Sequence, residues 1–494
     1  MQQEPSGSTS DGAAADRAAV DGTAVDGAAV DTNARDEGWL RRNRGGIGLA
    51  VAVFLVHSLS PSVQIGDSRL SALTAWRFLT HFDLHLQDYP MVAELGDSYD
   101  LVFAGGNTLP YFPWPTMLLA IPADILLLLT GQSAADLTLA DPSRTFLVEI
   151  PTASLIVAIT AWVLRSVLLS LPAVRIPPGV ATFGGAVFAF GTSAWSVGSR
   201  ALWQQTASML FLSLALLCAL RLRRSRRSWE WGLGACLALA AMARPTNAVI
   251  VALFVIWTLI SARFAVIRAA AAFLAVLAVF CGYSYSQYGS IIPPYYVPGR
   301  LQEIPAIGFV ESLGLNLISP SRGLIIFNPI VLLAVAGIVI RLRRRTFTGL
   351  DAVMAAAVVA QWLVIAKFGS TGGTVFGPRL MLDIVPFLIV LAAPTLLVLF
   401  EPARAGGRPW PRRMAVIGVV AMLIWGLFVN ATGALLRDSR CWSVVPVSVD
   451  AEPDRIWDWS DPQFLRPYRD LIEGHSLGWV LSGSCTPEAG FDSV

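Results

Sequence analysis

The sequence predicts an all-α membrane protein that crosses the bilayer many times. Of its 494 residues, 55% are hydrophobic and only 14% are charged, and the mean hydropathy is +0.60. Soluble domains are roughly a quarter charged, so this composition is typical of a membrane-embedded chain. The apolar runs approach the roughly 20 residues needed to span hydrocarbon, and they do not alternate in polarity. Helices are therefore favoured over a β-barrel.

The first 37 residues are expected to form a disordered, acidic cytoplasmic tail. They repeat aspartate among Ala, Val and Gly and offer no apolar face; the aspartates are Asp11, Asp16, Asp21, Asp26 and Asp31. Arg41, Arg42 and Arg44 then precede an apolar run over residues 45–64. The positive-inside rule places such a cluster in the cytoplasm, so the chain is expected to emerge outside near Gly66.

A long external segment, residues 65–143, is expected next. Its apolar run over 116–130 contains Pro122 and Asp124, and a run of about 15 residues suits an interfacial or re-entrant helix better than a full span. If this run does not cross, the later arginine clusters fall in the cytoplasm. The transmembrane domain, residues 38–435, then has about 11 helices, at 45–64, 145–166, 179–198, 203–220, 231–243, 246–262, 265–283, 323–340, 350–367, 380–400 and 413–435.

The polar C-terminal region, residues 436–494, is expected to be a small extracytoplasmic cap. It carries Trp442, Trp457, Trp459 and Trp479 among Asp, Pro and Gly. The region is too short for a large core, but a disulfide could stabilise it. Cys441 and Cys485 are expected to form that bond if the region lies outside the cytoplasm.

Several classes of function are disfavoured by missing motifs. The sequence has no P-loop, dinucleotide-binding glycine fingerprint, HExxH motif or zinc-type cysteine cluster. The net charge of +2 gives no indication of nucleic-acid binding, because the arginines form short clusters between apolar runs. His81 and His85 flank Asp83 with the i, i+4 spacing of a metal site, but an interfacial helix is the alternative. No metal or other cofactor is expected.

Short polar motifs recur on the predicted outer face, beginning with Gly66-Asp67-Ser68 directly after the first span. The others are Phe82-Asp83-Leu84-His85-Leu86, Trp203-Gln204, Arg244-Pro245, Ser319-Pro320-Ser321-Arg322-Gly323-Leu324, Phe327-Asn328-Pro329 and Phe376-Gly377-Pro378-Arg379. In this order and on one side of the membrane, the set resembles the GT-C superfamily of integral-membrane glycosyltransferases. Relatives include the aminoarabinose transferase of lipid A and the protein O-mannosyltransferases. The resemblance covers roughly residues 45–400.

The resemblance implies transfer of a sugar from a polyprenyl-phosphate donor to a glycan or lipid acceptor in the cell envelope. The reaction would occur on the extracytoplasmic face of the plasma membrane. Asp67 matches the family's catalytic acidic residue and would be the general base of an inverting displacement. The alternative is a helix cap or an ion pair with Arg69. Ser68, Gln204 and Gln205 stand where relatives have a further carboxylate, so a second catalytic acid is left open.

Four basic residues are candidates for binding the donor phosphate: Arg379, Lys367, Arg322 and Arg244. An arginine fork matches phosphate oxygens, and glycines between Lys367 and Arg379 allow backbone NH groups to approach an anion. The alternative is an anchor for lipid headgroups at a helix end. Trp203, Gln204 and Tyr295 are candidate contacts to the acceptor or a flap, although aromatic residues also collect at membrane interfaces.

Two other functions fit parts of the sequence. A transporter or flippase of lipid-linked sugars would use the same cavity without chemistry, but its charged residues should lie within spans and its halves should repeat. A scaffold without catalytic activity would tolerate loss of Asp67. The concentration of polar motifs in external loops favours the enzyme. The sequence does not indicate which sugar, acceptor or prenyl length is used.

Overall fold

The computed structural model describes residues 32–64, 66–140, 142–222, 227–297, 307–401 and 409–482, together with Cys485. The chain divides into two units, Met1–Arg44 and Gly45–Val494. Most of the predicted acidic tail, residues 1–31, lies outside the described residues. Helix α1 (Thr32–Leu59) begins inside the segment predicted to be disordered and continues into the first apolar run.

Six described helices are long and apolar enough to cross a membrane. They include α7 (Phe146–Leu168), α9 (Gln204–Arg221), α12 (Ala265–Tyr288) and α16 (Gly349–Phe368). The fifth joins η7 (Arg379–Ile384), α17 (Val385–Leu396) and η8 (Leu397–Leu399), and the sixth is α18 (Pro409–Leu435). The chain is therefore a multi-pass membrane protein, and the number of eleven crossings stays a prediction.

The remaining helices of the bundle are shorter, and two predicted spans are interrupted. The shorter elements are α8 (Pro178–Phe190), η3 (Ala194–Gly198), α10 (Ser228–Ala243), η4 (Pro245–Asn247), α11 (Ala248–Ser261), η5 (Pro294–Tyr296), α13 (Phe309–Ile318), α14 (Leu324–Phe327) and α15 (Ile330–Arg343). The span predicted at 179–198 breaks after Phe190, and that at 323–340 breaks at Asn328-Pro329. Proline supplies no backbone NH for a continuous helix, which accounts for the second break.

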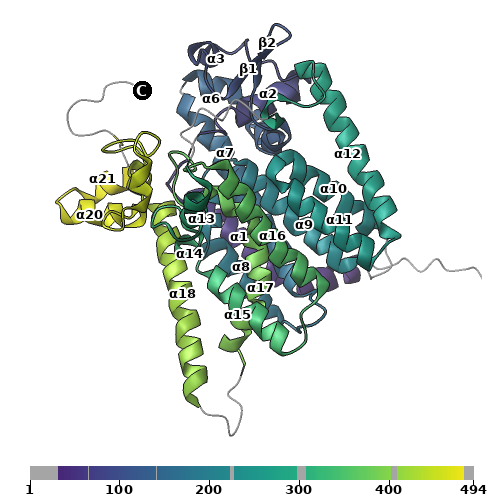
Figure 1. The fold of residues 1–494 in the computed structure, drawn as a ribbon. Coiled ribbons are helices and arrows are strands. Elements are labelled where there is room, and N and C mark those ends of the chain that lie inside the picture. Colours follow the sequence, from purple (N-terminus) through teal and green to yellow (C-terminus); the bar gives the residue numbers. More distant parts are fainter. Residues whose placement is uncertain are drawn as a thin grey trace, which may run out of the picture. The chain divides into compact units, whose positions relative to one another are not determined.

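Helix α17 forms the centre of the bundle, and all of its residues are buried. A Cβ atom at Gly337 of α15 would lie 2.1 Å from the Leu391 carbonyl oxygen, so glycine allows these two backbones to touch. In the apolar stretch of α12, and likewise in that of α18, only 22% is buried within the protein. The corresponding share in α9 is 83%. In the view of Figure 1, α12 and α18 lie at opposite edges of the bundle, as expected for lipid-facing helices.

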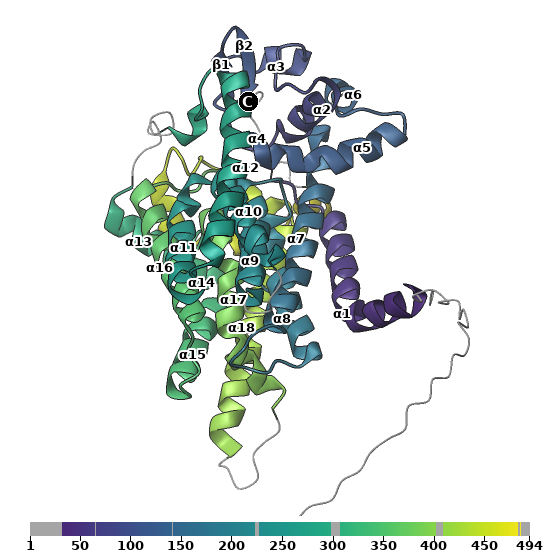
Figure 2. The ribbon, with the colours of Figure 1, turned by 90° about the vertical axis from the view of Figure 1, so that its right-hand side faces the viewer.

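The segment after the first apolar helix folds at one end of the bundle, where both views show its hairpin and short helices (Figures 1 and 2). A β-hairpin was not predicted there. Positive φ angles at Gly105 and Gly106 permit its tight turn. The elements are α2 (Ser71–His81), α3 (Pro90–Glu94), β1 (Leu101–Ala104), β2 (Asn107–Pro110), α4 (Trp114–Met117), η1 (Leu118–Ala120), α5 (Ile121–Leu129), α6 (Ala134–Ala140) and η2 (Pro142–Thr145).

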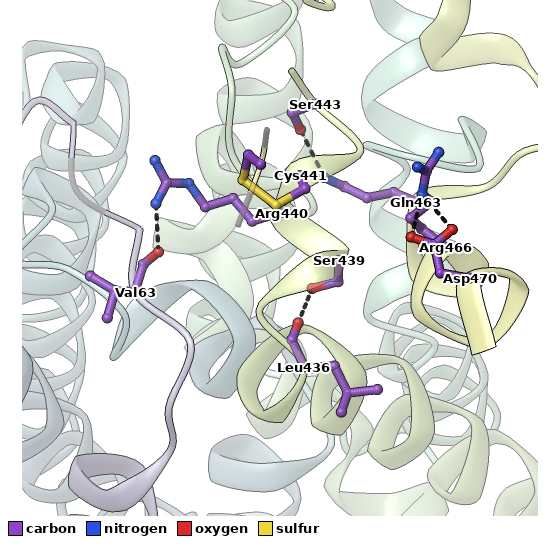
Figure 3. The surroundings of a disulfide bond; sticks show 10 residues. Val63, Leu436, Ser439, Arg440, Cys441, Ser443, Gln463, Arg466 and Asp470 are labelled. Atoms are coloured by element: carbon purple, nitrogen blue, oxygen red, sulfur yellow. Dashed lines mark hydrogen bonds and ion pairs between the residues drawn. A yellow bond between two sulfur atoms is a disulfide. The ribbon is translucent and has the colours of Figure 1, made fainter. Parts of the chain in front are cut away.

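The C-terminal region packs around the buried Trp442 and contains a disulfide between Cys441 and Cys485. Figure 3 shows that Arg440, next to the disulfide, donates a 3.1 Å hydrogen bond to the Val63 carbonyl oxygen. The C-terminal region therefore contacts the chain just before Asp67. Its elements are α19 (Asp438–Cys441), η9 (Pro453–Trp457), η10 (Gln463–Leu465), α20 (Arg466–Ile472) and α21 (Leu477–Ser482).

Candidate active site

Asp67 and Arg379 form an ion pair although 312 positions separate them in the sequence. The Arg379 Nη1 donates to Asp67 Oδ2 at 2.8 Å. Both side chains remain partly exposed, at 20% for Asp67 and 12% for Arg379. The pair joins the turn after the first apolar helix to the start of η7. It is therefore a charged site whose two side chains are both partly exposed.

The turn that carries Asp67 is fixed by its neighbour Arg69. The Arg69 guanidinium makes a bidentate ion pair with the buried Asp100, with 2.8 Å between Nη2 and Oδ1, and donates to Ser98 Oγ at 2.5 Å. Arg69 is thus engaged away from Asp67. Nor does Asp67 cap the following helix, because Leu70 is the N-cap of α2 and no side chain bonds there. Among the described residues, Asp67 therefore forms neither the ion pair with Arg69 nor the helix cap that were the alternatives.

Arg379 rests on an aromatic platform, and one of its donor nitrogens has no partner among the described residues. Its guanidinium carbon lies 4.5 Å from the centroid of the Trp203 ring, and Trp203 is fully buried. A Cβ at Gly66 would lie 3.3 Å from the same ring, so glycine lets the turn approach Trp203 closely. The Arg379 Nε is buried and has no hydrogen-bond partner among the described residues. Arg379 is therefore oriented by stacking but not saturated.

Arg322, by contrast, is buried and has each of its nitrogens engaged by the protein. It donates to the Thr371, Ser321 and Gly373 carbonyl oxygens at 2.9–3.0 Å, to Gln463 Oε1 at 2.8 Å, and to Ser443 Oγ at 3.4 Å. Five contacts match the five NH groups of a guanidinium. The structure thus gives Arg322 a structural role and leaves no free donor for a phosphate, contrary to the role expected from the sequence.

Gln463 of the C-terminal region supports the same loop from the other side. This fully buried amide accepts hydrogen bonds from Arg322 and from the Gly377 NH, at 2.8 and 3.1 Å. It donates to the Val375 carbonyl and Ser443 Oγ, at 3.0 and 2.9 Å; the Ser443 contact is drawn in Figure 3. The loop leading to Arg379 is therefore held by residues that come from the C-terminal cap.

Arg244 and Lys367 have different surroundings from Arg379. Arg244 is buried, forms an ion pair with Asp383 and donates to the Leu380 carbonyl at 2.8 Å. This pairing anchors η4 against η7 and engages Nη1 of the arginine, and the expected phosphate contact of Arg244 stays a prediction. Lys367 is exposed in the last turn of α16, and no ion pair of this side chain occurs among the described residues.

Two tyrosines complete the surroundings of the pair. Tyr99 packs edgewise on Phe112 and Tyr295 packs on it at a tilt, with ring centroids 5.9 and 5.7 Å apart. Burial raises the pKa of each phenol to about 12, and the charge of Asp67 contributes in the same direction. Both hydroxyls are therefore protonated near neutral pH and able to donate. Gln204, by contrast, is buried at the start of α9.

Three polar residues that contact the predicted site residues or their neighbours were not predicted from the sequence. Asp383 and Glu149 lie inside apolar runs, and Gln463 lies in a cap whose structure could not be inferred. Glu149 accepts a 2.5 Å hydrogen bond from Ser68, directly next to Asp67. An acidic residue in an apolar run is a signal of function, because burying a lone charge is costly. That signal was present for both carboxylates.

The chemistry of the site is that of one carboxylate beside one available guanidinium. A carboxylate can accept a proton, and a guanidinium can bind a phosphate. His85 Nδ1 lies 3.7 Å from Asp83 Oδ2, but His81 contacts Thr80. Among the described residues, no group of three or more His, Cys, Asp or Glu side chains could hold a metal ion.

Comparison with known proteins identifies the fold through structure and not through sequence. No family model matches the chain, and no curated protein sequence matches it. The Archaeoglobus fulgidus oligosaccharyltransferase, solved with a tethered acceptor peptide, has a similar fold with a TM-score of 0.50 at 12% identity. The match covers 85% of this chain and 59% of that one. The chain has a GT-C-like fold.

Two crystal structures of ArnT from Cupriavidus metallidurans were also matched. The apo form gives a TM-score of 0.46 at 16% identity, and the form bound to undecaprenyl phosphate gives 0.47 at 15% identity. Each match covers 83% of this chain, with 70% and 69% of the respective ArnT chains.

Proposed function

We propose that the protein is a glycosyltransferase that moves a hexose or pentose from a polyprenyl phosphate to a glycan or lipid acceptor. The observation that carries this proposal is the Asp67–Arg379 pair, in which the arginine Nε has no partner among the described residues. Its position directly after an apolar helix suits a donor that arrives through the membrane. The fold shared with an oligosaccharyltransferase supports the proposal.

In the proposed reaction, Asp67 takes the proton of the acceptor hydroxyl as its oxygen forms a bond to the anomeric carbon. The bond between that carbon and the donor phosphate oxygen breaks, and the phosphate retains the electron pair. A lipid phosphate needs no proton to leave, but a nearby cation stabilises its developing charge. Arg379 supplies that cation, exchanging part of its contact with Asp67 for the phosphate. A single displacement inverts the anomeric centre.

The extracytoplasmic side of the plasma membrane is the proposed location of the site. Arginine clusters between the spans place the N-terminus in the cytoplasm under the positive-inside rule. The disulfide of the C-terminal region suits an oxidising compartment, and that region contacts the chain just before Asp67. Membrane lipids are the expected surroundings, nucleic acid is not an expected partner, and no metal or cofactor is proposed. Exposed Lys367 is proposed to attract the anionic donor.

The alternative is a transporter or flippase for lipid-linked sugars, and a transfer assay separates the two. Purified protein in lipid nanodiscs would be given a panel of polyprenyl-phosphate sugars and envelope acceptors. The enzyme should release polyprenyl phosphate and form a glycosidic product, and Asp67→Asn should abolish both. Translocation of donor across a vesicle membrane, without transfer by the wild type, would instead support the flippase.

A further inference from the structure

Glu149 is a buried carboxylate in the first turn of α7, directly behind the candidate site. Its side chain is nearly inaccessible, with 1% of the residue exposed. One oxygen, Oε2, accepts a 2.5 Å hydrogen bond from Ser68 Oγ and a longer contact, 3.4 Å, from the Leu202 NH. The other oxygen, Oε1, has no hydrogen-bond partner among the described residues.

These two contacts connect Glu149 to both halves of the ion pair. Ser68 follows Asp67 in the turn, and Ser68 is itself buried. Leu202 precedes Trp203, whose ring lies beneath the Arg379 guanidinium. A single carboxylate thus contacts the neighbour of the proposed base and the neighbour of the platform that orients the proposed phosphate ligand. Residues 68, 149 and 202 are far apart in sequence, and the Glu149 side chain brings them together.

The burial of Glu149 is energetically costly, and the known contacts offset it only in part. Among the described residues, no arginine or lysine pairs with this carboxylate. Burying a carboxyl group with one oxygen left unpaired costs about 1–3 kcal/mol. The N-terminus of α7 offers a partial positive charge, which is worth only about 0.3–1 kcal/mol at most exposed sites. The stabilisation of the helix N-terminus is therefore too small to offset the cost of burying Glu149.

We infer that Glu149 is a positioning residue for the glycosyl transfer proposed above, on which this inference rests. By accepting the Ser68 hydroxyl, Glu149 fixes the turn that directs Asp67 toward Arg379. Through Leu202, it also holds the loop that places Trp203 beneath that arginine. Because only 1% of Glu149 is exposed, it acts through Ser68 and Leu202 and does not exchange protons with a substrate.

The test compares three variants in the transfer assay: Glu149→Gln, Glu149→Ala and Ser68→Ala. Glutamine still presents an oxygen that can accept both bonds, so Glu149→Gln should keep kcat within about tenfold of wild type. Glu149→Ala should lower kcat by about 100-fold, the scale expected when a reacting group is misplaced by about an ångström. The KM for the donor should change much less, because Arg379 still binds the phosphate.

A double-mutant cycle separates positioning from general destabilisation. If the Ser68–Glu149 bond carries the effect, Ser68→Ala should lower kcat on its own, and adding Glu149→Ala should lower it little further. Thr152→Ala is a matched control in α7, since it removes only a buried bond to the Val148 carbonyl. Its kcat should equal that of wild type. Thermal unfolding of each variant reports the cost to the fold.

Three results would overturn the inference. Wild-type kcat in both Ser68→Ala and Glu149→Ala would show that the contact is not needed. Additive losses would show that the two residues act separately. Loss of activity in folded Glu149→Gln would assign Glu149 a role in proton transfer. If Glu149→Ala does not fold, Ser68→Ala still tests the bond, because it leaves Glu149 and its Leu202 contact in place. Absence of transfer by the wild type itself would instead reject the proposed function.

Discussion

Arg322 and Arg379 both lie beside one glycine-rich loop, yet they have opposite environments. A Cβ at Gly372 would lie 3.7 Å from Arg322 Nε, and one at Gly373 would lie 3.9 Å from Arg379 Nη2. Arg322 is 2% exposed and uses its donors on carbonyl, amide and hydroxyl oxygens. Among the described residues, Arg379 has one carboxylate partner, an aromatic platform and a buried Nε without a partner.

The difference shows what distinguishes a structural cation from one that binds a ligand. A guanidinium whose donors are all satisfied gains nothing from a phosphate, and its removal leaves several acceptors unpaired. A guanidinium with spare donors gains new bonds when an anion arrives. Arg322 therefore belongs to the support of the site, together with Gln463 and the C-terminal region. Arg379 belongs to its open side, together with Asp67.

The largest expected effect on the open side is that of Asp67→Asn. The amide keeps the size of the side chain but cannot act as a general base, so turnover should fall by about 10²–10⁴-fold. Transfer rates with saturating donor would measure this loss, and the melting temperature should change little. Asp97→Asn, in an exposed loop, is the matched control and should keep full activity. Normal turnover in Asp67→Asn would refute the assignment of the base.

On the support side, Arg322→Lys should lower the stability of the fold. Lysine keeps the charge but cannot satisfy five acceptors from one planar fork, and breaking a buried charged network costs about 3–5 kcal/mol. Chemical or thermal unfolding in detergent would detect the change. The folded fraction should still bind polyprenyl phosphate. Weaker binding of polyprenyl phosphate with unchanged stability would instead show that Arg322 contacts the donor phosphate.

Arg379→Lys should show the reverse pattern, with a loss of binding and little change in stability. Lysine cannot make bidentate contacts with a phosphate or stack on Trp203 in the same way. Loss of one charged hydrogen bond costs about 1.5–3 kcal/mol, so the Kd for undecaprenyl phosphate should rise by about 10- to 100-fold. Titration of the purified variant would measure it. Unaltered affinity would show that the phosphate binds elsewhere.

A smaller effect is expected from the buried carboxyl pair of the C-terminal region. Burial raises the pKa of Asp438 to about 7, and the neighbouring Asp470 acts in the same direction. The folded region holds this proton more tightly than the unfolded chain, so stability is greatest below the ordinary aspartate range and falls as pH rises from about 4 to about 7. Asp438→Asn should flatten that dependence in melting curves. An unchanged slope would exclude Asp438 as its source.

The smallest effect is expected for Lys367→Gln. This exposed lysine lacks an ion pair among the described residues and can attract the donor only through screened charge. The KM for the donor should rise by no more than about threefold, and more at low salt than at high salt. A loss as large as that of Arg379→Lys would place Lys367 in direct contact with the phosphate.

Much of the helical framework followed from the sequence by itself. Hydropathy placed α7, α9, α12, α16 and α18 to within a few residues, because a chain in hydrocarbon must satisfy its backbone internally. The hairpin at Gly105-Gly106 was missed, since four-residue strands in a polar loop give a weak pattern. Helix α13 was missed because prolines nearby indicated a continuous loop.

The sequence by itself determined that the chain is a helical membrane protein and that Asp67 lies at the exit of its first apolar helix. Only the tertiary structure decided which cation faces that carboxylate. Arg244, Arg322 and Arg379 look alike as residues next to proline or glycine. They differ in how many of their donors bond to acceptors that are distant in the sequence. Asp383 is such an acceptor for Arg244, and Gln463 is one for Arg322. Free hydrogen-bonding capacity is a property of packing, and packing joins residues that the sequence keeps apart.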